Sequence, residues 1–352
     1  MQEHIQNELA SFIANCDWEK IAPHFKEDAA YRVLDWIGCA VAGEHYPQVE
    51  IAQKYFIENG DQGNSTVIGH QTKCSPRTAA FLNGIAGHVC ELDDGHRTAI
   101  GHPGSIAVPT ALALGEHLNA SGADVLKAVI LGYEVFSRLG RTVNPSHYRT
   151  WHTTASLLKL SAEETNNAIG IAATMAGGLV ESFGSHAKAI NIAEACQNGI
   201  DAASLAKLGL TGSHSALLGK KGFVAATCTE PHTENLTHLS EDALVSDSAF
   251  YKVYSSCGHT NSPLDVLFKL MAKYAINPKE IERIDVATYK VAFDLTSQLK
   301  TATEDEAKFS LPFCFAISLL KGSVSLANFS QAVRTDAEVL DLARRVHVIE
   351  SP

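Results

Sequence analysis

The stretch CELDDGHRTAIGHPG, residues 90–104, places dense polar chemistry between two apolar segments of the chain. Within fifteen residues it holds three carboxylates, two imidazoles, one guanidinium and three glycines. The flanking segments 77–89 and 105–118 are rich in small and apolar residues, which is typical of core helices. A capping turn explains a single aspartate or glycine here. It does not explain the whole cluster, so the pattern predicts a buried functional loop between two helices.

The composition is that of a globular protein with a large core. The chain has 352 residues, of which 45% are hydrophobic and 19% charged, which is enough for one large domain or two ordinary ones. A net charge of -11 argues against a nucleic-acid partner. No apolar run has the length needed to cross a bilayer, and the first twenty residues lack the pattern of a signal peptide. We therefore expect a cytoplasmic protein without a membrane partner.

The eight cysteines are widely and irregularly spaced, and none forms a CxxC pair. Most have apolar neighbours, as Cys39 has in WIGCAVAG and Cys196 in AEACQNG. This pattern indicates free thiols in a reducing compartment. It gives no support to an iron–sulfur cluster or a structural zinc site.

Hydrophobic periodicity divides the chain into two parts. Helical spacing dominates up to about residue 250, with expected helices at 6–19, 28–42, 48–59, 76–89, 105–118, 122–140, 155–181 and 192–209. Beyond that point the pattern is mixed. Expected strands at 284–289 and 346–349 accompany expected helices at 309–320 and 337–345. The sequence therefore predicts a mainly α protein, with an all-helical domain over 1–255 and a smaller α+β domain over 256–352.

Three further segments carry candidate functional residues. His152 lies in YRTWHTT beside two hydroxyl groups, although a lone histidine in a loop is more often structural. Lys188 is the cation of the polar loop 182–191, although most lysines are simply solvated. Lys252 and His259 lie in KVYSSCGHTNSPLD at the domain boundary, where they would suit an anion. A helix cap explains Ser262-Pro263 in that segment, but it does not explain His259.

Other chemistries have weaker support. The carboxylates at 91, 93 and 94, with His96 and His102, could hold a hard metal ion. Against this, the side chains of two adjacent aspartates tend to diverge. No G-x-S-x-G elbow, P-loop or G-x-G-x-x-G motif after a strand is present.

Six motifs together resemble the MmgE/PrpD family, in the order in which its members carry them. They are NGIAGHVCELDDGHRTAIGHPGSIAVPTALALGE, GYEVFSRLGRTVNPSHYRTWHTTA, AIGIAATMAGGL followed by Lys188, LAKLGLTG, KVYSSCGHTNSPLD and EAKFSLPFCFAISLLKG. The family includes 2-methylcitrate dehydratase, cis-aconitate decarboxylase and iminodisuccinate epimerase. The resemblance implies a large helical domain with an α+β lid, a homodimer, a site between the domains, and no metal or organic cofactor.

The resemblance also implies site residues. Matched position by position, the catalytic residues of the family fall on Glu91, His102, His152 and Lys188, and its substrate-binding residues on Asp93, Lys252 and His259. The family's shared step moves a proton at a carbon α to a carboxylate of a di- or tricarboxylic acid. Such a step needs a base aimed at carbon and cations that stabilise the developing charge. Either carboxylate, Glu91 or Asp93, or a neutral histidine could be the base, and the sequence leaves this choice open.

We therefore expect a cofactor-independent lyase on a polycarboxylate, most like 2-methylcitrate dehydratase, with an epimerase, isomerase or decarboxylase as the alternative. Phe313 stands where the decarboxylating members carry tyrosine, which disfavours decarboxylation. Three departures raise the alternative of a shortened, inactive relative. The chain has Ile190-Asn191-Ile192-Ala193 where members continue with His and Gly, lacks roughly three helical turns after Thr154, and ends at Pro352, where members return to the helical domain.

Overall fold

The computed structural model describes residues 2–71, 73–144, 158–241, 244 and 248–351. It is mainly α, as the sequence predicts. The chain forms two compact units. Unit 1 comprises Met1–Val89, Asp93–Glu181 and Ala187–Tyr251, and unit 2 comprises Cys90–Leu92, Ser182–His186 and Lys252–Pro352. Unit 2 thus includes two short pieces from earlier in the chain, in addition to the continuous segment Lys252–Pro352.

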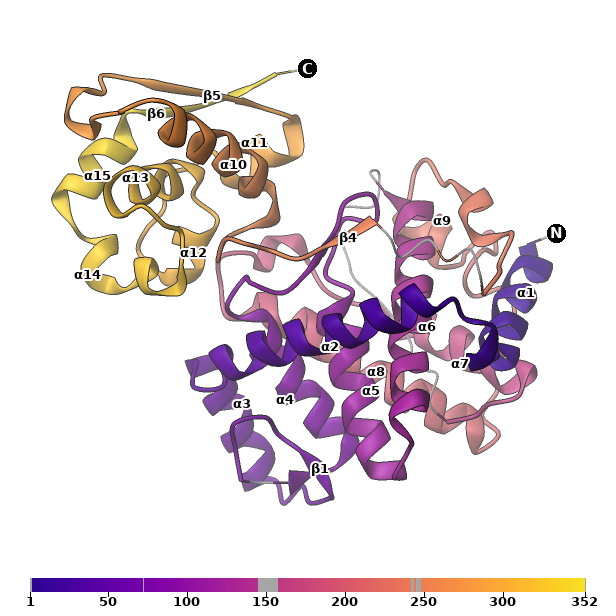
Figure 1. Ribbon diagram of the computed structural model, residues 1–352. Coiled ribbons are helices and arrows are strands. Elements are labelled where there is room, and N and C mark those ends of the chain that lie inside the picture. Colours follow the sequence, from indigo (N-terminus) through magenta and orange to yellow (C-terminus); the bar gives the residue numbers. More distant parts are fainter. Residues whose placement is uncertain (1, 72, 145–157, 242–243, 245–247, 352) are drawn as a thin grey trace. The chain divides into compact units, whose positions relative to one another are not determined.

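Unit 1 is a bundle of helices packed around α4 (Figure 1). Its α-helices are α1 Gln2–Asn15, α2 Pro23–Gly43, α3 Pro47–Glu58, α4 Pro76–His88, α5 Gly104–Leu118, α6 Gly122–Val143, α7 Ala162–Thr174, α8 Ala187–Lys207 and α9 Phe223–Thr227. The 3-10 turns are η1 Trp18–Lys20, η2 Val180–Ser182, which reaches into unit 2, and η3 Thr233–Leu236.

Helix α4 is the central helix of unit 1 because every residue from Thr78 to His88 is buried. Its small residues let neighbouring helices approach closely. A Cβ atom on Gly87 would lie 2.2 Å from Nε1 of Trp36 in α2, and one on Gly84 would lie 3.1 Å from Sγ of Cys196 in α8. A helix that is buried on all sides lies in the core, and its few polar side chains are buried with it. Its last residue, His88, is therefore a buried imidazole.

Unit 1 also contains two short antiparallel sheets, which the prediction of an all-helical domain did not include. Strand β1 Ser65–Thr66 pairs with β2 Lys73–Cys74. Strand β3 Gly95–His96 pairs with β4 Ala249–Phe250, more than 150 residues further along the chain. A Cβ atom on Gly95 would lie 2.5 Å from the Phe250 ring, so a larger residue at this position would displace that ring.

Unit 2 is a smaller α+β unit. Its strands β5 Ile284–Thr288 and β6 Val346–Glu350 pair in parallel, with Ile284 opposite Val346. Its α-helices are α10 Gly258–Lys273, α11 Lys290–Thr296, α12 Glu304–Lys308, α13 Leu311–Lys321, α14 Gln331–Arg334 and α15 Ala337–Arg344, and its 3-10 turns are η5 Pro278–Glu280 and η6 Leu326–Phe329. Helix α13 forms the centre of the hydrophobic core, in which Phe313 is completely buried.

Several predicted helices differ in their bounds from those observed, and the last part of the loop expected over 182–191, which carries Lys188, is the start of α8. The helix expected over 155–181 is observed as the shorter α7, which begins with a capping box between Ser161 and Glu164. This helix ends at Thr174, and residues 155–157 lie outside the described part of the chain. The helix expected over 309–320 is preceded by a separate helix α12, because Ser310 caps a new helix that has Pro312 in its first turn. No described helix is both long enough and apolar enough to span a membrane.

Candidate active site

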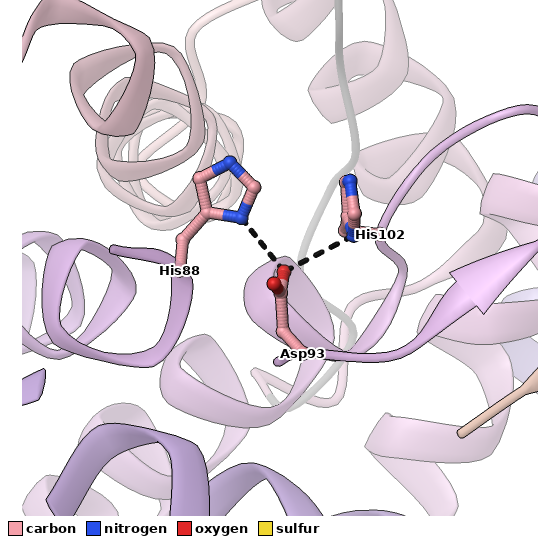
Figure 2. Close-up of side chains that lie close together, drawn as sticks. All are labelled: His88, Asp93 and His102. Atoms are coloured by element: carbon pink, nitrogen blue, oxygen red, sulfur yellow. Dashed lines mark hydrogen bonds and ion pairs between the residues drawn. The ribbon is translucent and has the colours of Figure 1, made fainter. Parts of the chain in front are cut away.

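The side chain of Asp93 accepts hydrogen bonds from α4 and α5, the two helices on either side of the polar stretch 90–104. Its Oδ2 atom lies 2.7 Å from Nδ1 of His88 at the end of α4, and 2.8 Å from Oγ of Ser105 in α5. Nδ1 of His102, in the loop before α5, lies 3.2 Å from the same oxygen. Figure 2 shows both imidazoles converging on this carboxylate. Asp93 is 1% exposed, so these donors take the place of the water molecules that would solvate an exposed carboxylate.

Lys188 extends this network from the start of α8. Its Nζ atom lies 2.7 Å from Nε2 of His88, and both side chains are buried. A lysine ammonium has only donors, so Nε2 of His88 accepts a hydrogen bond from it. The proton of the neutral His88 ring then lies on Nδ1, which donates to Asp93. The result is a directional chain from Lys188 through His88 to Asp93.

His102 completes the cluster, and its tautomer follows from its neighbours. Its Nδ1 atom faces two acceptors, the main-chain oxygen of Asp94 at 2.6 Å and Oδ2 of Asp93 at 3.2 Å. Nδ1 must therefore carry a proton, and Nε2 of the neutral ring carries the lone pair. The side chain is 15% exposed, whereas that of His88 is 3% exposed. Of the two imidazoles, His102 is thus the better placed to reach a substrate.

Three groups of this cluster also lie close enough together to hold a metal ion. One ligand atom from each of His88, Asp93 and His102 lies within 4.8 Å of the other two. The contacts are nevertheless those of a hydrogen-bonded network, because both imidazoles direct protonated Nδ1 atoms at one carboxylate oxygen. A metal ion would have to displace both protons. It would also lie close to the Lys188 ammonium, so the donor set fits a proton-transfer site better than a metal centre.

Asp94 turns away from this cluster, as adjacent aspartates do, but it is more than the turn residue suggested by its Asp-Gly pair. Its carboxylate accepts hydrogen bonds from the Tyr133 hydroxyl at 2.8 Å and the Gly104 amide at 3.0 Å. Nη1 of Arg32 lies 3.6 Å from Oδ2 of Asp94. Burial raises the pKa of Asp94 to about 7, and Arg32 and Tyr133 oppose this rise.

Glu91 and Lys252 belong to unit 2, where they pair with each other. Nζ of Lys252 lies 3.3 Å from Oε2 of Glu91 and 3.1 Å from its main-chain oxygen. The Ser255 hydroxyl also donates to the Cys90 carbonyl at 2.6 Å, which fixes this short piece of chain within the unit. Glu91 has a φ of 54°, a left-handed conformation that is unusual for a residue with a side chain. A carboxylate held in a buried ion pair is a poor candidate for the base.

His259 is half-buried at the start of α10 and hydrogen-bonds through Nδ1 to the Tyr289 hydroxyl. Burial, assisted by the charge of Lys252, lowers the pKa of His259 to about 4. The ring is therefore neutral near pH 7. A neutral His259 can contact a substrate through a hydrogen bond, and its role in substrate binding stays a prediction.

Of the residues chosen from sequence, the structure brings together Asp93, His102 and Lys188 in unit 1, and it pairs Glu91 with Lys252 in unit 2. His152 lies outside the described residues. Sequence reasoning missed His88, because an imidazole at the end of an apolar helix resembles a core residue. Its position five residues before Asp93 was the available signal.

Comparisons with known proteins identify the family. The MmgE/PrpD N-terminal domain matches residues 7–235, and the MmgE/PrpD C-terminal domain matches residues 254–352. Cis-aconitate decarboxylase of Aspergillus terreus is 27% identical over 382 residues, covering 96% of this chain and 77% of the relative. The human cis-aconitate decarboxylase is 28% identical over 345 residues, covering 91% of this chain and 71% of the relative. The two domain matches together span most of the sequence, and this chain belongs to the MmgE/PrpD family.

Proposed function

We propose that this chain is a cofactor-independent lyase that decarboxylates cis-aconitate or a closely similar unsaturated tricarboxylic acid. The observation that carries the proposal is the chain of contacts from Lys188 through His88 and Asp93 to His102. It supports transfer of a proton at Nε2 of His102. The cis-aconitate decarboxylases among the relatives supply the substrate class.

The reaction is a decarboxylation with an allylic shift. The bond between the methylene carbon and its carboxylate breaks, and its electron pair forms a new double bond to the central carbon. The original double bond then places its electrons on the remaining alkene carbon, which lies α to a carboxylate. That carbon takes a proton from the enzyme. Cis-aconitate and one proton thus become carbon dioxide and an unsaturated five-carbon dicarboxylic acid.

In this scheme His102 delivers the proton from Nε2 as an imidazolium. Asp93 stabilises that imidazolium through Nδ1 and holds the ring in place, as a carboxylate behind a catalytic histidine does. His88 and Lys188 balance the negative charge of Asp93. The buried Lys188 ammonium also contributes positive potential where the enolate-like charge develops. A deprotonated His102 recovers its proton from solvent before the next turnover.

Dehydration of a 2-methylcitrate-like hydroxy acid is the second candidate, because the same His102 can act in the opposite direction. Its neutral Nε2 would remove the proton α to a carboxylate, and the resulting imidazolium would protonate the departing hydroxyl. Phe313 favours this alternative. It is completely buried against Phe329, with ring centroids 5.9 Å apart, and offers no hydroxyl where decarboxylating members carry tyrosine.

A substrate panel separates these outcomes. The purified chain is incubated with cis-aconitate while released carbon dioxide is measured, and with 2-methylcitrate and citrate stereoisomers while alkene absorbance is followed. Carbon dioxide from cis-aconitate supports the decarboxylase, and alkene formation from a hydroxy acid supports the dehydratase. If neither appears, deuterium exchange from D2O into the α carbon without elimination identifies an epimerase or isomerase. Tricarboxylate binding with neither turnover nor exchange would overturn the proposal in favour of an inactive binding protein.

A further inference from the structure

Asp94 lies next to Asp93 in the catalytic loop, residues 93–103, and its side chain is held by a different set of partners. Arg32 comes from α2 and Tyr133 from α6, and they are 5% and 2% exposed. The Arg32 guanidinium lies over the Tyr133 ring, with Cζ 4.7 Å from the ring centroid, and Nη1 faces Oδ2 of Asp94 at 3.6 Å. The Tyr133 hydroxyl donates to that oxygen, and the Gly104 amide donates to Oδ1. Both oxygens of the carboxylate are therefore fixed.

The space around this carboxylate leaves it little freedom. A Cβ atom on Gly104 would lie 2.6 Å from the Tyr133 hydroxyl and 2.8 Å from Oδ1 of Asp94. Arg32 is itself anchored, because its Nε atom bonds to the Asp28 carboxylate one turn earlier on α2. The Arg32 guanidinium also lies over the Tyr251 ring, with Cζ 5.5 Å from the ring centroid. Residues of three helices, Arg32 of α2, Tyr133 of α6 and Gly104 of α5, thus hold the Asp94 carboxylate.

The main chain of Asp94 connects this network to the catalytic histidine. Its carbonyl oxygen accepts the Nδ1 proton of His102 at 2.6 Å, which is closer than the Asp93 carboxylate at 3.2 Å. Because both carboxylate oxygens are held, the Cα atom of Asp94 is anchored, and this restrains the main-chain carbonyl that faces His102. A fixed acceptor at Nδ1 selects the tautomer whose lone pair lies on Nε2.

We propose that Arg32 and Tyr133 are positioning residues that act through Asp94 to keep His102 in its Nδ1–H tautomer. Neither residue belongs to the Lys188–His88–Asp93–His102 chain, and neither is singled out by the pattern of the polar loop. The inference rests on the proposed function of His102. Charge supports it as well as geometry, because Asp93 and Asp94 are adjacent carboxylates and Arg32 offsets the repulsion between them.

The test measures the tautomer of His102 directly, in the full chain labelled with ¹⁵N-histidine. The imidazole nitrogens of the wild type are assigned by the signals that vanish in His102→Gln. Tyr133→Phe removes one hydroxyl at nearly constant volume, and Arg32→Lys keeps the charge but loses the planar guanidinium. We expect both variants to shift the His102 signals from a protonated Nδ1 towards a mixture of tautomers. We also expect kcat to fall about tenfold with KM nearly unchanged.

Arg138→Lys is the matched control. Arg138 is also buried on α6, pairs with Glu134 and bonds to the carbonyls of Asn235 and Thr237, but it does not contact the catalytic loop through any of these bonds. Its His102 signals should match the wild type. If Arg32→Lys does not fold, as judged by circular dichroism, the inference is tested with Tyr133→Phe alone. Unchanged His102 signals in a folded Tyr133→Phe chain would overturn the inference. A tautomer shift in a chain that turns over no tricarboxylate would instead leave the positioning intact and overturn the proposed function.

Discussion

At the scale of single residues, the oxygen Oδ2 of Asp93 determines how the site is built. Three donors, from His88, Ser105 and His102, meet at this one buried atom. A carboxylate can accept all three, whereas a neutral amide in its place would direct its own donors at part of the network. The two imidazoles would then lose the acceptor that fixes their protons. The orientation of the site therefore depends on the charge of Asp93 more than on its size.

We predict that Asp93→Asn lowers kcat by about 10³-fold while the protein remains folded, because the change disturbs the tautomers of both histidines. Steady-state kinetics on the active substrate, with circular dichroism as a check of folding, measures the effect. Asp201→Asn is the control, since its partner Arg77 is half-exposed and their ion pair lies at the surface. Equal kcat values for wild type and Asp93→Asn would refute the role of this carboxylate.

Asp35 gives a prediction about pH. Burial, together with the charge of Asp93, raises the pKa of Asp35 from 3.8 to about 6 in the folded protein. Its contribution to stability is therefore fully present below the unfolded pKa and is lost as the pH rises through 6. Asp35→Asn should be more stable than wild type by about 1 kcal/mol near pH 8, after allowance for solvent screening. Urea unfolding at about pH 8 and about pH 4 tests this, and a difference that persists at the lower pH contradicts it.

At the scale of elements, the close approach of α6 to the catalytic loop sets the position of His102. A Cβ atom on Gly140 would lie 2.4 Å from Cβ of Ala99 and 2.8 Å from its main-chain oxygen. That same oxygen accepts a hydrogen bond from Asn144 at 2.7 Å. Ala99 lies only three residues before His102, so any shift of the loop at this point is passed to the imidazole.

Gly140→Ala should therefore reduce both stability, by about 1–3 kcal/mol, and kcat, because the added methyl group must displace the loop. Gly38→Ala is the matched control, as Gly38 lies on the exposed face of α2 with nothing within 4 Å of the added atom. This second substitution should stabilise the protein by about 0.5–1 kcal/mol and leave activity unchanged. Thermal unfolding and kinetics of the two variants test the pair. The idea fails if Gly140→Ala behaves like Gly38→Ala.

The elements differ in how far the sequence could predict them. Strong local patterns were sufficient for α6, expected at 122–140 and found at Gly122–Val143, and for the strand expected at 284–289. The pairing of β3 with β4 could not be predicted, because two-residue strands far apart in the chain carry no periodicity. His88 was missed for a related reason. Its role depends on Lys188, a hundred residues away, as well as on Asp93, and no local pattern indicates the contact with Lys188.

At the scale of the whole molecule, the family resemblance predicts a homodimer. Light scattering coupled to gel filtration should give a mass of about twice the 37.8 kDa of one chain. The result should not depend on dilution across the micromolar range if the interface is of the large, obligate kind. A mass equal to one chain would contradict this expectation and leave the proposed chemistry, which uses residues of unit 1 alone, unaffected.

The central claim is that His102 transfers a proton at a carbon α to a carboxylate of a tricarboxylic acid. The most direct measurement is conversion of cis-aconitate in D2O, with the product examined by NMR and mass spectrometry. The account predicts carbon dioxide and a five-carbon dicarboxylic acid with one deuterium on the carbon α to a carboxylate, and a rate at least about 10²-fold lower for His102→Gln. Turnover by His102→Gln at the wild-type rate, or a folded wild-type chain that neither releases carbon dioxide nor places deuterium on any tricarboxylate tested, would contradict it.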